Sequence, residues 1–457
     1  MIRPSLQDFR QLFALAVPVV FVQLGLMAMG VVDTMIMGRV SAESLAGAAI
    51  GNVCTYALGT FGLGMLMALD PLVSQAVGAK DEPSVVRAFQ RGIVIAGVLG
   101  VGAGLALLWV EPVLRALGQP EVIVRVAGPF VRVQAPGMIA FYLFVALRQT
   151  LTALGHLRSM VWTIVIANLI NGFLSWALVF GEWGFPAMGA TGSGLATTIA
   201  RWSMLLMLAA FGWRHFRPRL RWRPDTLHLR PILRMVRIGA PIASQYMLEF
   251  GVFAAVALLM GRLGPIPAAA HQIAINIASL TFMVPLGVSS AGSVLVGRAI
   301  GAGDAPHARR AGVSALAVGA AFMLVSACML LVIPHLLARA YTPEVAVIAL
   351  AATLIPIAGV FQVFDGLQVV SIGVLRGTGD TRTPLIVSLI GYWVIALPIG
   401  LWLGLSAGYG PRGLWWGLTA GLVIVSLVLL ARVRVRLWGP LERIHVDEPA
   451  RSQALEA

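Results

Sequence analysis

Twelve long apolar stretches follow one another along the chain, separated by short polar segments. They lie at residues 13–36, 46–70, 90–110, 124–146, 160–181, 190–212, 236–260, 268–292, 310–333, 346–371, 384–404 and 412–433. A helix needs about 20 apolar residues to cross a bilayer, and it satisfies its own backbone hydrogen bonds there. The pattern predicts an all-α integral membrane protein with twelve transmembrane helices. The first stretch contains Pro18 and Asp33 and lacks a small-residue cleavage pattern, so we expect it to be retained as a span.

Composition argues against other classes of protein. Of the 457 residues, 59% are hydrophobic and 11% are charged. In an ordinary soluble domain about 25% of the residues are charged. A soluble enzyme or a disordered chain of this length could not cover its surface with so few charges. The two cysteines, Cys54 and Cys328, fall inside predicted spans, so they are expected to be packing residues rather than a disulfide framework.

The basic residues gather on one side of the predicted membrane. The net charge of +14 comes from 33 basic and 19 acidic residues. When the loops and ends are numbered alternately, one side carries 24 lysines and arginines and the other carries five. Basic loops resist translocation, so both termini are predicted to be cytoplasmic. The charge therefore indicates topology and not a nucleic-acid partner.

The second half of the chain repeats the first at an almost constant offset. The matched pairs are Pro18 and Pro241, Met37-Gly38-Arg39 and Met260-Gly261-Arg262, Gly78-Ala79 and Gly301-Ala302, and Gly194-Leu195 and Gly417-Leu418; Gly155 and Gly379 match once a single gap is allowed. Each half holds six spans, an even number, so both halves enter the membrane in the same direction as a parallel repeat. We expect two six-helix bundles that rock around a central cavity, as in a secondary transporter. The expected parts are an N-terminal lobe at 1–213, a basic cytoplasmic linker at 214–234, a C-terminal lobe at 235–433 and a cytoplasmic tail at 434–457.

Four acidic residues lie inside the predicted spans: Asp33, Asp70, Glu249 and Asp365. An acid in a span is costly unless it faces a cavity, carries a proton or holds a cation. Packing roles should be shared by both halves, yet Asp33, Glu249 and Asp365 have uncharged counterparts in the repeat. We therefore predict that these three are functional. Asp70 lies at the cytoplasmic end of the second span and is expected to be structural.

Carboxyl groups in a low-dielectric cavity can support antiport. Desolvation disfavours their charged form, so each readily holds either a proton or a compensating cation. If a positively charged organic substrate and a proton or inorganic ion compete for them, the gradient of one drives the other outward. A negative cavity also selects cationic substrates.

Other polar residues in or near the spans are expected to be structural. Arg125 and Arg132 are seven residues apart, so we expect them on one face of the fourth span, with their charged ends reaching the interface. His271 is expected to be buried and hydrogen-bonded. The only lysine, Lys80, is not in a phosphate-binding loop, and no HExxH, GxSxG or CxxC motif is present. An enzyme active site therefore has no support in the sequence.

Several motifs in order resemble the multidrug and toxic compound extrusion family, and within it the NorM-like branch. In the second half they are Glu249 in its span, AAHQIAIN at 269–276, FMVPLGVSSAGSVLVGRAIGAGD, FQVFDGLQVVSIGVLRGTGDTRTP and GYWVIALPIG; in the first half they are VDTMIMGR, LDPLVSQAVGAKD, ALGHLRS and GSGLATTIA. The resemblance implies twelve helices in two lobes in a bacterial inner membrane. It also implies a monomer, surrounded by membrane lipid, that exports cationic amphipathic compounds in exchange for protons or sodium and needs no other cofactor.

The resemblance also assigns site residues. Glu249 and Asp365 match the acidic pair of the cation site, which makes them candidate Na⁺ ligands, and Asp33 matches the first-lobe aspartate that is associated with coupling. Supporting polar or cavity positions are Asn171, Thr197, Ser175, Phe361 and Gln272.

Two of these positions depart from the family pattern. Phe361 stands where sodium-coupled relatives carry tyrosine, and Ser175 stands where a second asparagine or an aspartate is usual. Phenylalanine keeps a π face but lacks an oxygen, so proton coupling gains weight over sodium coupling.

Two other functions agree less well with the sequence than antiport of drugs. A flippase for an amphipathic lipid precursor would prefer basic residues in its cavity, to bind phosphate, and the three acids inside the spans argue against it. A membrane-embedded enzyme would need a nucleophile and a base at one depth, and the sequence shows no such pair.

Overall fold

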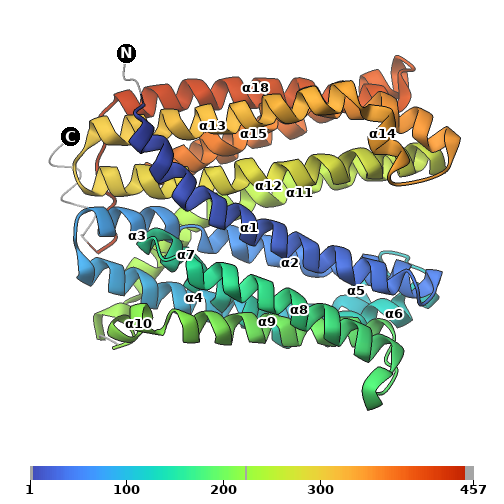
Figure 1. The fold of residues 1–457 in the computed structure, drawn as a ribbon, viewed down its shortest axis with the longest axis horizontal. Coiled ribbons are helices and arrows are strands. Elements are labelled where there is room, and N and C mark those ends of the chain that lie inside the picture. The colour runs from blue at the N-terminus through green and yellow to red at the C-terminus, as the bar shows by residue number, and fades with distance from the viewer. Residues whose placement is uncertain (1–3, 222–223, 448–457) are drawn as a thin grey trace. The chain divides into compact units, whose positions relative to one another are not determined.

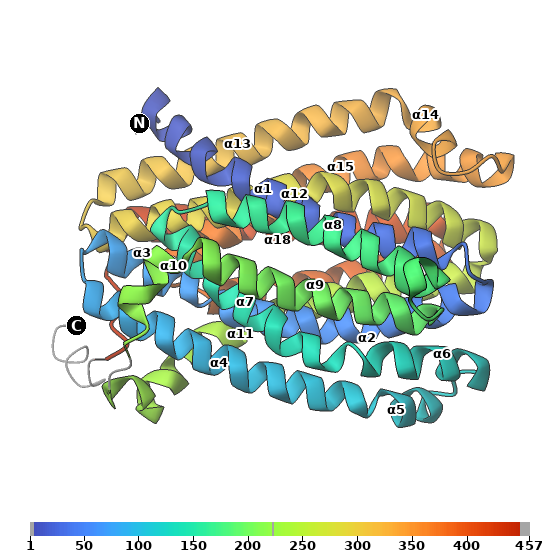
Figure 2. The same cartoon turned by 60° about the horizontal axis from the view of Figure 1, so that its bottom comes forward.

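The computed structural model describes residues 4–221 and 224–447, and every regular element in these ranges is a helix. Twelve helical segments are long and apolar enough to cross a membrane (Figures 1 and 2). They are Leu6–Met37, Glu43–Gly78, Glu82–Leu108, Ala135–Leu154, Arg158–Phe180, Ala190–Phe211, Leu229–Leu263, Pro265–Gly301, Ala305–Val332, Val345–Gly377, Arg382–Ser406 and Gly410–Trp438. The predicted all-α membrane fold with twelve spans is confirmed.

The fourth span is the one placed least well by hydropathy. It was expected at 124–146 and is instead helix α7, Ala135–Leu154, preceded by a separate helix α6, Glu121–Arg132. Pro136 lies in the first turn of α7, where the missing N–H of proline is tolerated. The expectation that Arg125 and Arg132 share a face of the fourth span is therefore wrong. Both belong to α6, where the Arg132 guanidinium lies 2.7 Å from the carboxylate of Glu111.

The helices form two compact units. Unit 1 comprises Met1–Val20, Gly78–Lys80 and Ser244–Ile444, and unit 2 comprises Phe21–Val77, Asp81–Ala243 and His445–Ala457. The first parts of α1 (Leu6–Met37) and α11 (Leu229–Leu263) each group with the helices of the other half of the chain, as does the short segment Gly78–Lys80. The changeovers lie close to Pro18 and Pro241, which are counterparts in the repeat.

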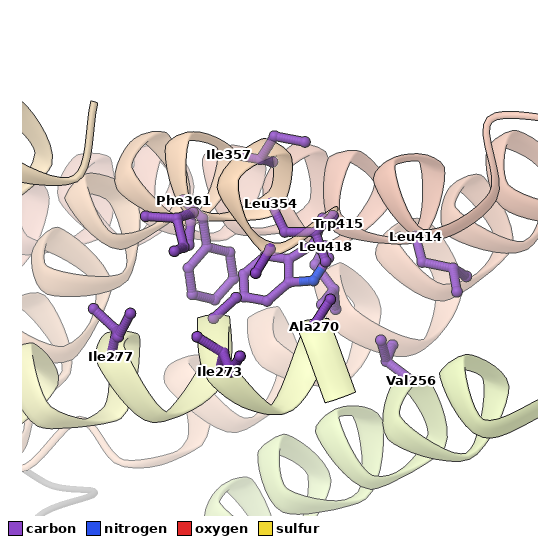
Figure 3. Close-up of a cluster of buried hydrophobic side chains, with 14 of the residues drawn as sticks. Val256, Ala270, Ile273, Ile277, Leu354, Ile357, Phe361, Leu414, Trp415 and Leu418 are labelled. Carbon is purple, nitrogen blue, oxygen red and sulfur yellow. The ribbon is translucent and has the colours of Figure 1, made fainter. Parts of the chain in front are cut away.

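Unit 1 is built around α12 (Pro265–Gly301) and α15 (Val345–Gly377), which pack against each other. Helix α13 (Ala305–Val332) packs on both, and α18 (Gly410–Trp438) packs on α15. Figure 3 shows part of the apolar cluster between them, where Trp415, Phe361 and Ile273 lie close together. Trp415 is completely buried, so this cluster gives the unit a dry core.

The eleventh span, Arg382–Ser406, is an irregular helix. It runs through α16 (Arg382–Leu389), the π-helical segments η4 (Ile390–Ala396) and η5 (Trp402–Ser406), and α17 (Leu397–Leu401) between them. A π-helix is wider than an α-helix, is rare, and occurs frequently at functional sites. Its presence changes the direction in which η4 presents its side chains.

Unit 2 is built from six packed helices of the first half. Helix α4 (Glu82–Leu108) packs on α7, and α8 (Arg158–Phe180) packs on α9 (Ala190–Phe211). Helix α2 (Ala42–Leu66) packs on α6, and α7 also packs on α9. The short α3 (Leu69–Gly78) follows α2 and places Asp70 in its first turn, where an acid is favourable to the helix dipole.

The shorter helices complete the fold. They are α5 (Val110–Ala116), η1 (Glu182–Gly184), α10 (Trp213–Phe216), η2 (Arg217–Arg219), η3 (Pro224–Leu227) and α14 (Pro334–Arg339).

Parts of the basic linker, and Asp447 at the end of the described residues, are held on α4. The buried Gln90 amide donates to the backbone oxygens of Arg219 and Arg221, at 2.7 and 2.8 Å. Asp447 forms ion pairs with Arg87 at 2.6 Å and with the buried Arg91 at 2.7 Å. Burial alone would raise the pKa of Asp447, but these two guanidinium groups hold it below its usual value. Arg219 and Arg221 of the linker therefore pack as part of unit 2.

Candidate carboxylate sites in the two units

Glu249 is held in a polar network inside the seventh span. Its Oε1 atom accepts hydrogen bonds from Nε2 of Gln245 (3.1 Å), one turn earlier on α11, and from Nε2 of Gln368 (2.8 Å) on α15. The side chains of both glutamines are almost completely buried. Both bonds go to one oxygen, which leaves Oε2 as the atom on which this carboxylate can take a proton or a cation.

Tyr392 extends the same network. Its hydroxyl donates to Oε1 of Gln368 at 2.8 Å, and the residue is 1% exposed. Tyr392 lies in the π-helical segment η4. The chain Tyr392, Gln368, Glu249 has a consistent direction, because each group donates to the next one. Such a chain fixes the amide orientation of Gln368 and therefore the position of the Glu249 carboxylate.

Asp365 lies one turn before Gln368 on α15, close enough to Glu249 for their charges to interact. Its side chain is half-buried, as is that of Glu249. Two carboxylates at short range in a low-dielectric environment repel each other unless a proton or a cation is present. The structure thus brings together the acidic pair that was predicted from the sequence.

Aromatic rings lie on the same helices as this pair. Phe361, one turn before Asp365, is buried against Trp415 at a centroid distance of 5.6 Å and against Phe253 at 6.1 Å. Figure 3 shows the Phe361 and Trp415 rings edge to face. Phe361 is therefore part of the packed core of unit 1 and offers a ring, but no oxygen, at its position.

Two polar residues of the AAHQIAIN motif have different surroundings. Gln272 is exposed, and its amide donates to Asn276 on the next turn at 3.1 Å. His271 is buried, as expected, and its ring lies 5.7 Å from that of Trp415. Its Nδ1 atom has no hydrogen-bond partner among the described residues, so the expectation of a hydrogen-bonded histidine fails at this nitrogen.

Asp33 has a separate set of partners in unit 2. Its Oδ1 accepts from the hydroxyl of Ser175 at 2.7 Å, and its Oδ2 accepts from the hydroxyl of Thr197 at 2.9 Å. Asp33 is 8% exposed, and Ser175 is completely buried. The departure from the family pattern at Ser175 therefore still supplies a hydrogen-bond donor to this carboxylate.

Asn171 lies beside the same carboxylate, one turn before Ser175 on α8, and is completely buried. Its amide makes no hydrogen bond within 3.5 Å to a residue that the structure describes, but it is close enough to Asp33 to interact with the carboxylate. Asn171 therefore adds a third polar side chain to the surroundings of Asp33, beside Ser175 and Thr197.

Four polar residues at or near these carboxylates were missed from the sequence: Gln245, Gln368, Tyr392 and Arg201. The two glutamines lie one turn from the predicted acids on the same helices, at i−4 from Glu249 and i+3 from Asp365. That spacing puts them on the same helix face as the acid, which is the signal that could have found them.

Removing the two hydroxyls that contact Asp33 is expected to weaken transport. Each hydrogen bond to a charged group contributes about 1.5–3 kcal/mol, so Ser175→Ala and Thr197→Val should each lower dye efflux several-fold, and the double variant should lower it further. The measurement is ethidium efflux from cells that express equal amounts of each variant. Thr34→Val is the matched control, because the exposed Thr34 hydroxyl donates only to the backbone of Gly30. Efflux by the double variant at the parent rate would contradict a role for this network.

Comparison with known proteins identifies the family. A family model described as MatE matches residues 18–177 and again residues 241–402. The chain belongs to the MatE family. This is the multidrug and toxic compound extrusion family that the motifs resemble. Because one family model matches both halves, and the two matches begin at the paired prolines Pro18 and Pro241, the internal repeat read from the sequence is confirmed.

Relatives of the MatE family cover nearly the whole chain. A probable multidrug resistance protein NorM of Mesorhizobium japonicum is 37% identical, with 93% of each chain covered. The multidrug resistance protein NorM of Burkholderia vietnamiensis is 38% identical over 92% of this chain and 93% of its own. The crystal structure of the eukaryotic MATE transporter AtDTX14 matches with a TM-score of 0.86 and 23% identity, covering 94% of this chain and 96% of that one. The NorM-like assignment and the MatE fold are thus both established for this multi-pass membrane protein.

Proposed function

We propose that this protein is a multidrug efflux antiporter of the bacterial inner membrane, with both termini in the cytoplasm. It exports cationic amphipathic compounds in exchange for protons or sodium, and its two lobes alternate access to the two sides. The observation that carries the proposal is the Glu249 carboxylate, held by Gln245 and Gln368 within a membrane span and close to Asp365. The names of the NorM relatives support the same function.

The chemistry of the carboxylate pair supports exchange. Two acids at short range in a low-dielectric environment are stable when a proton or a cation offsets their charge. Either a cationic substrate or the coupling ion can supply this positive charge. Once one of them is bound, the carboxylate pair attracts the other less strongly. Binding of one therefore favours release of the other, which is the requirement for antiport.

Protons are favoured as the coupling ion. Sodium is bound in proteins by oxygen ligands, and the side chain of Phe361 supplies none at its position beside Asp365. The hydrogen bonds from Gln245 and Gln368 leave Oε2 of Glu249 as the site where a proton can bind.

Counterflow in proteoliposomes tests the proposal. Ethidium movement is followed under an imposed pH gradient alone and then under a sodium gradient alone. We expect the pH gradient to drive ethidium and the sodium gradient to have little effect; the opposite result would assign sodium to the carboxylate pair. Proteoliposomes that contain Glu249→Gln are the control for leak. If neither gradient moved the dye, antiport of organic cations would be wrong.

A further inference from the structure

A single arginine lies in the middle of the sixth span. Arg201 is at the centre of α9, Ala190–Phe211, which has a mean hydropathy of 1.4 over its apolar window. A charged side chain at this depth is costly, and such residues face the interior of a bundle or a cavity and serve a function. None of the hydrogen bonds described above for the three carboxylates comes from this cation.

The contacts of Arg201 include no salt bridge to a residue that the structure describes. Its Cζ lies 5.5 Å from the centroid of the Phe141 ring, and its Nη1 lies 3.5 Å from the sulfur of Met138. Both partners belong to α7 in the same unit. None of the ion pairs found within 4.0 Å among residues 4–221 and 224–447 includes Arg201.

Asp33, the nearby acid in the same unit, does not form a salt bridge with Arg201. It is within electrostatic range of Arg201, but its two oxygens accept hydrogen bonds from Ser175 and Thr197. The structure therefore holds a cation and an anion in unit 2 without pairing them directly. Such an arrangement can receive a molecule that carries both charges.

The guanidinium group selects the class of ligand. It presents N–H donors in a planar fork that matches a carboxylate in two parallel hydrogen bonds. The Phe141 ring holds the guanidinium in place by a cation–π contact. The Arg201 side chain is half-buried, so part of it is accessible to a ligand.

We propose that Arg201 is an anion-binding residue of unit 2, which takes the carboxylate of amphoteric substrates. The assignment rests on the proposed efflux function, because it defines which compounds that function accepts. Compounds that carry a carboxylate beside their cationic group should therefore bind through Arg201, while purely cationic compounds depend on the acids alone.

Two dyes that differ at one group provide the test. Rhodamine B carries a carboxylate and a cationic aromatic system, and its ethyl ester carries only the cation. The dissociation constants of both dyes are measured by fluorescence polarisation on the purified full-length protein. In Arg201→Gln, we expect the ratio of the rhodamine B constant to the ester constant to rise about tenfold or more, since the variant loses a charge-assisted pair of hydrogen bonds. Arg201→Lys keeps the charge but loses the fork and should give an intermediate ratio.

Controls separate recognition from folding. Arg237→Gln removes an exposed arginine from α11 of the same unit and should leave the ratio at the parent value. If Arg201→Gln does not elute as a single peak in size exclusion, the ratio in Arg201→Lys decides. An unchanged ratio in the folded variant, a parallel loss of both dyes, or a parent protein that binds the ester and not rhodamine B would each overturn the assignment.

The proposed function has its own readout in the same system. Gradient-driven movement of the ester by the parent protein in proteoliposomes reports efflux without the carboxylate. If the ester moves and the ratio does not respond to Arg201, only the assignment of Arg201 fails. If the parent protein moves neither dye, efflux itself fails, and the Arg201 proposal fails with it.

Discussion

Glu249→Gln should reduce gradient-driven ethidium efflux to the level of cells that lack the protein. A glutamine amide has the same shape as the carboxylic acid, and its oxygen can still accept hydrogen bonds from Gln245 and Gln368. It cannot ionise, however, so it can neither release a proton nor attract a cationic substrate. Asp365→Asn should have the same effect, because the pair acts through its shared charge. The measurement is efflux at matched amounts of protein in the membrane.

The matched control for this prediction is Glu121→Gln. Glu121 lies in α6, outside the twelve spans, where it forms an ion pair with Arg115 at 3.1 Å. An exposed ion pair of this kind contributes about 0–1 kcal/mol, so efflux should stay at the parent level. Full ethidium extrusion by both Glu249→Gln and Asp365→Asn would refute the coupling site.

Gly417→Ala should strongly destabilise unit 1. A Cβ atom at position 417 would lie 2.2 Å from the Cα and 2.3 Å from the nitrogen of Gly400. These are backbone atoms of α17, so no side-chain rotation can relieve the overlap between α17 and α18. Overpacking of a core costs about 1–3 kcal/mol, and we expect a value at or above the top of that range. The measurement is the Tm of the purified protein in detergent.

Gly261→Ala is the matched control for the packing prediction. Gly261 lies in α11 of the same unit, and an added Cβ would meet no atom within 4 Å. Alanine favours a helix over glycine by about 1 kcal/mol in soluble hosts, so the Tm should stay the same or rise slightly. Equal Tm values for Gly417→Ala and the parent protein would show that the two helices can separate without cost.

Hydropathy was sufficient for the number of spans because each span must be about 20 apolar residues long. It was insufficient at the fourth span, where the apolar signal of α6 runs into that of α7 and only the turn before Pro136 separates the two. The grouping of the first part of α1 with second-half helices also has no signal in the apolar pattern, because it depends on tertiary packing.

Charge was the reliable guide to the sites, and uncharged polarity was not. Glu249, Asp365 and Asp33 stand out in a sequence because a charge in a span is costly. Gln368 and Tyr392 do not, since glutamine and tyrosine are tolerated in many places. Their importance comes from tertiary contacts: Gln368 on α15 bonds to Glu249, 119 positions earlier, and to Tyr392, 24 positions later. The sequence could name the acids but not the groups that orient them.

The π-helical segment Ile390–Ala396 bears on how a duplicated protein becomes asymmetric. A π turn holds more residues than an α turn, so the side chains that follow it point in a different direction from those after an α turn. In the first half, the equivalent stretch lies in the continuous helix α8, where Ala167, Asn168 and Leu169 occupy the candidate counterparts of Tyr392. The π segment that places Tyr392 against Gln368 therefore has no equivalent in α8, and the two halves differ in helix geometry as well as in sequence.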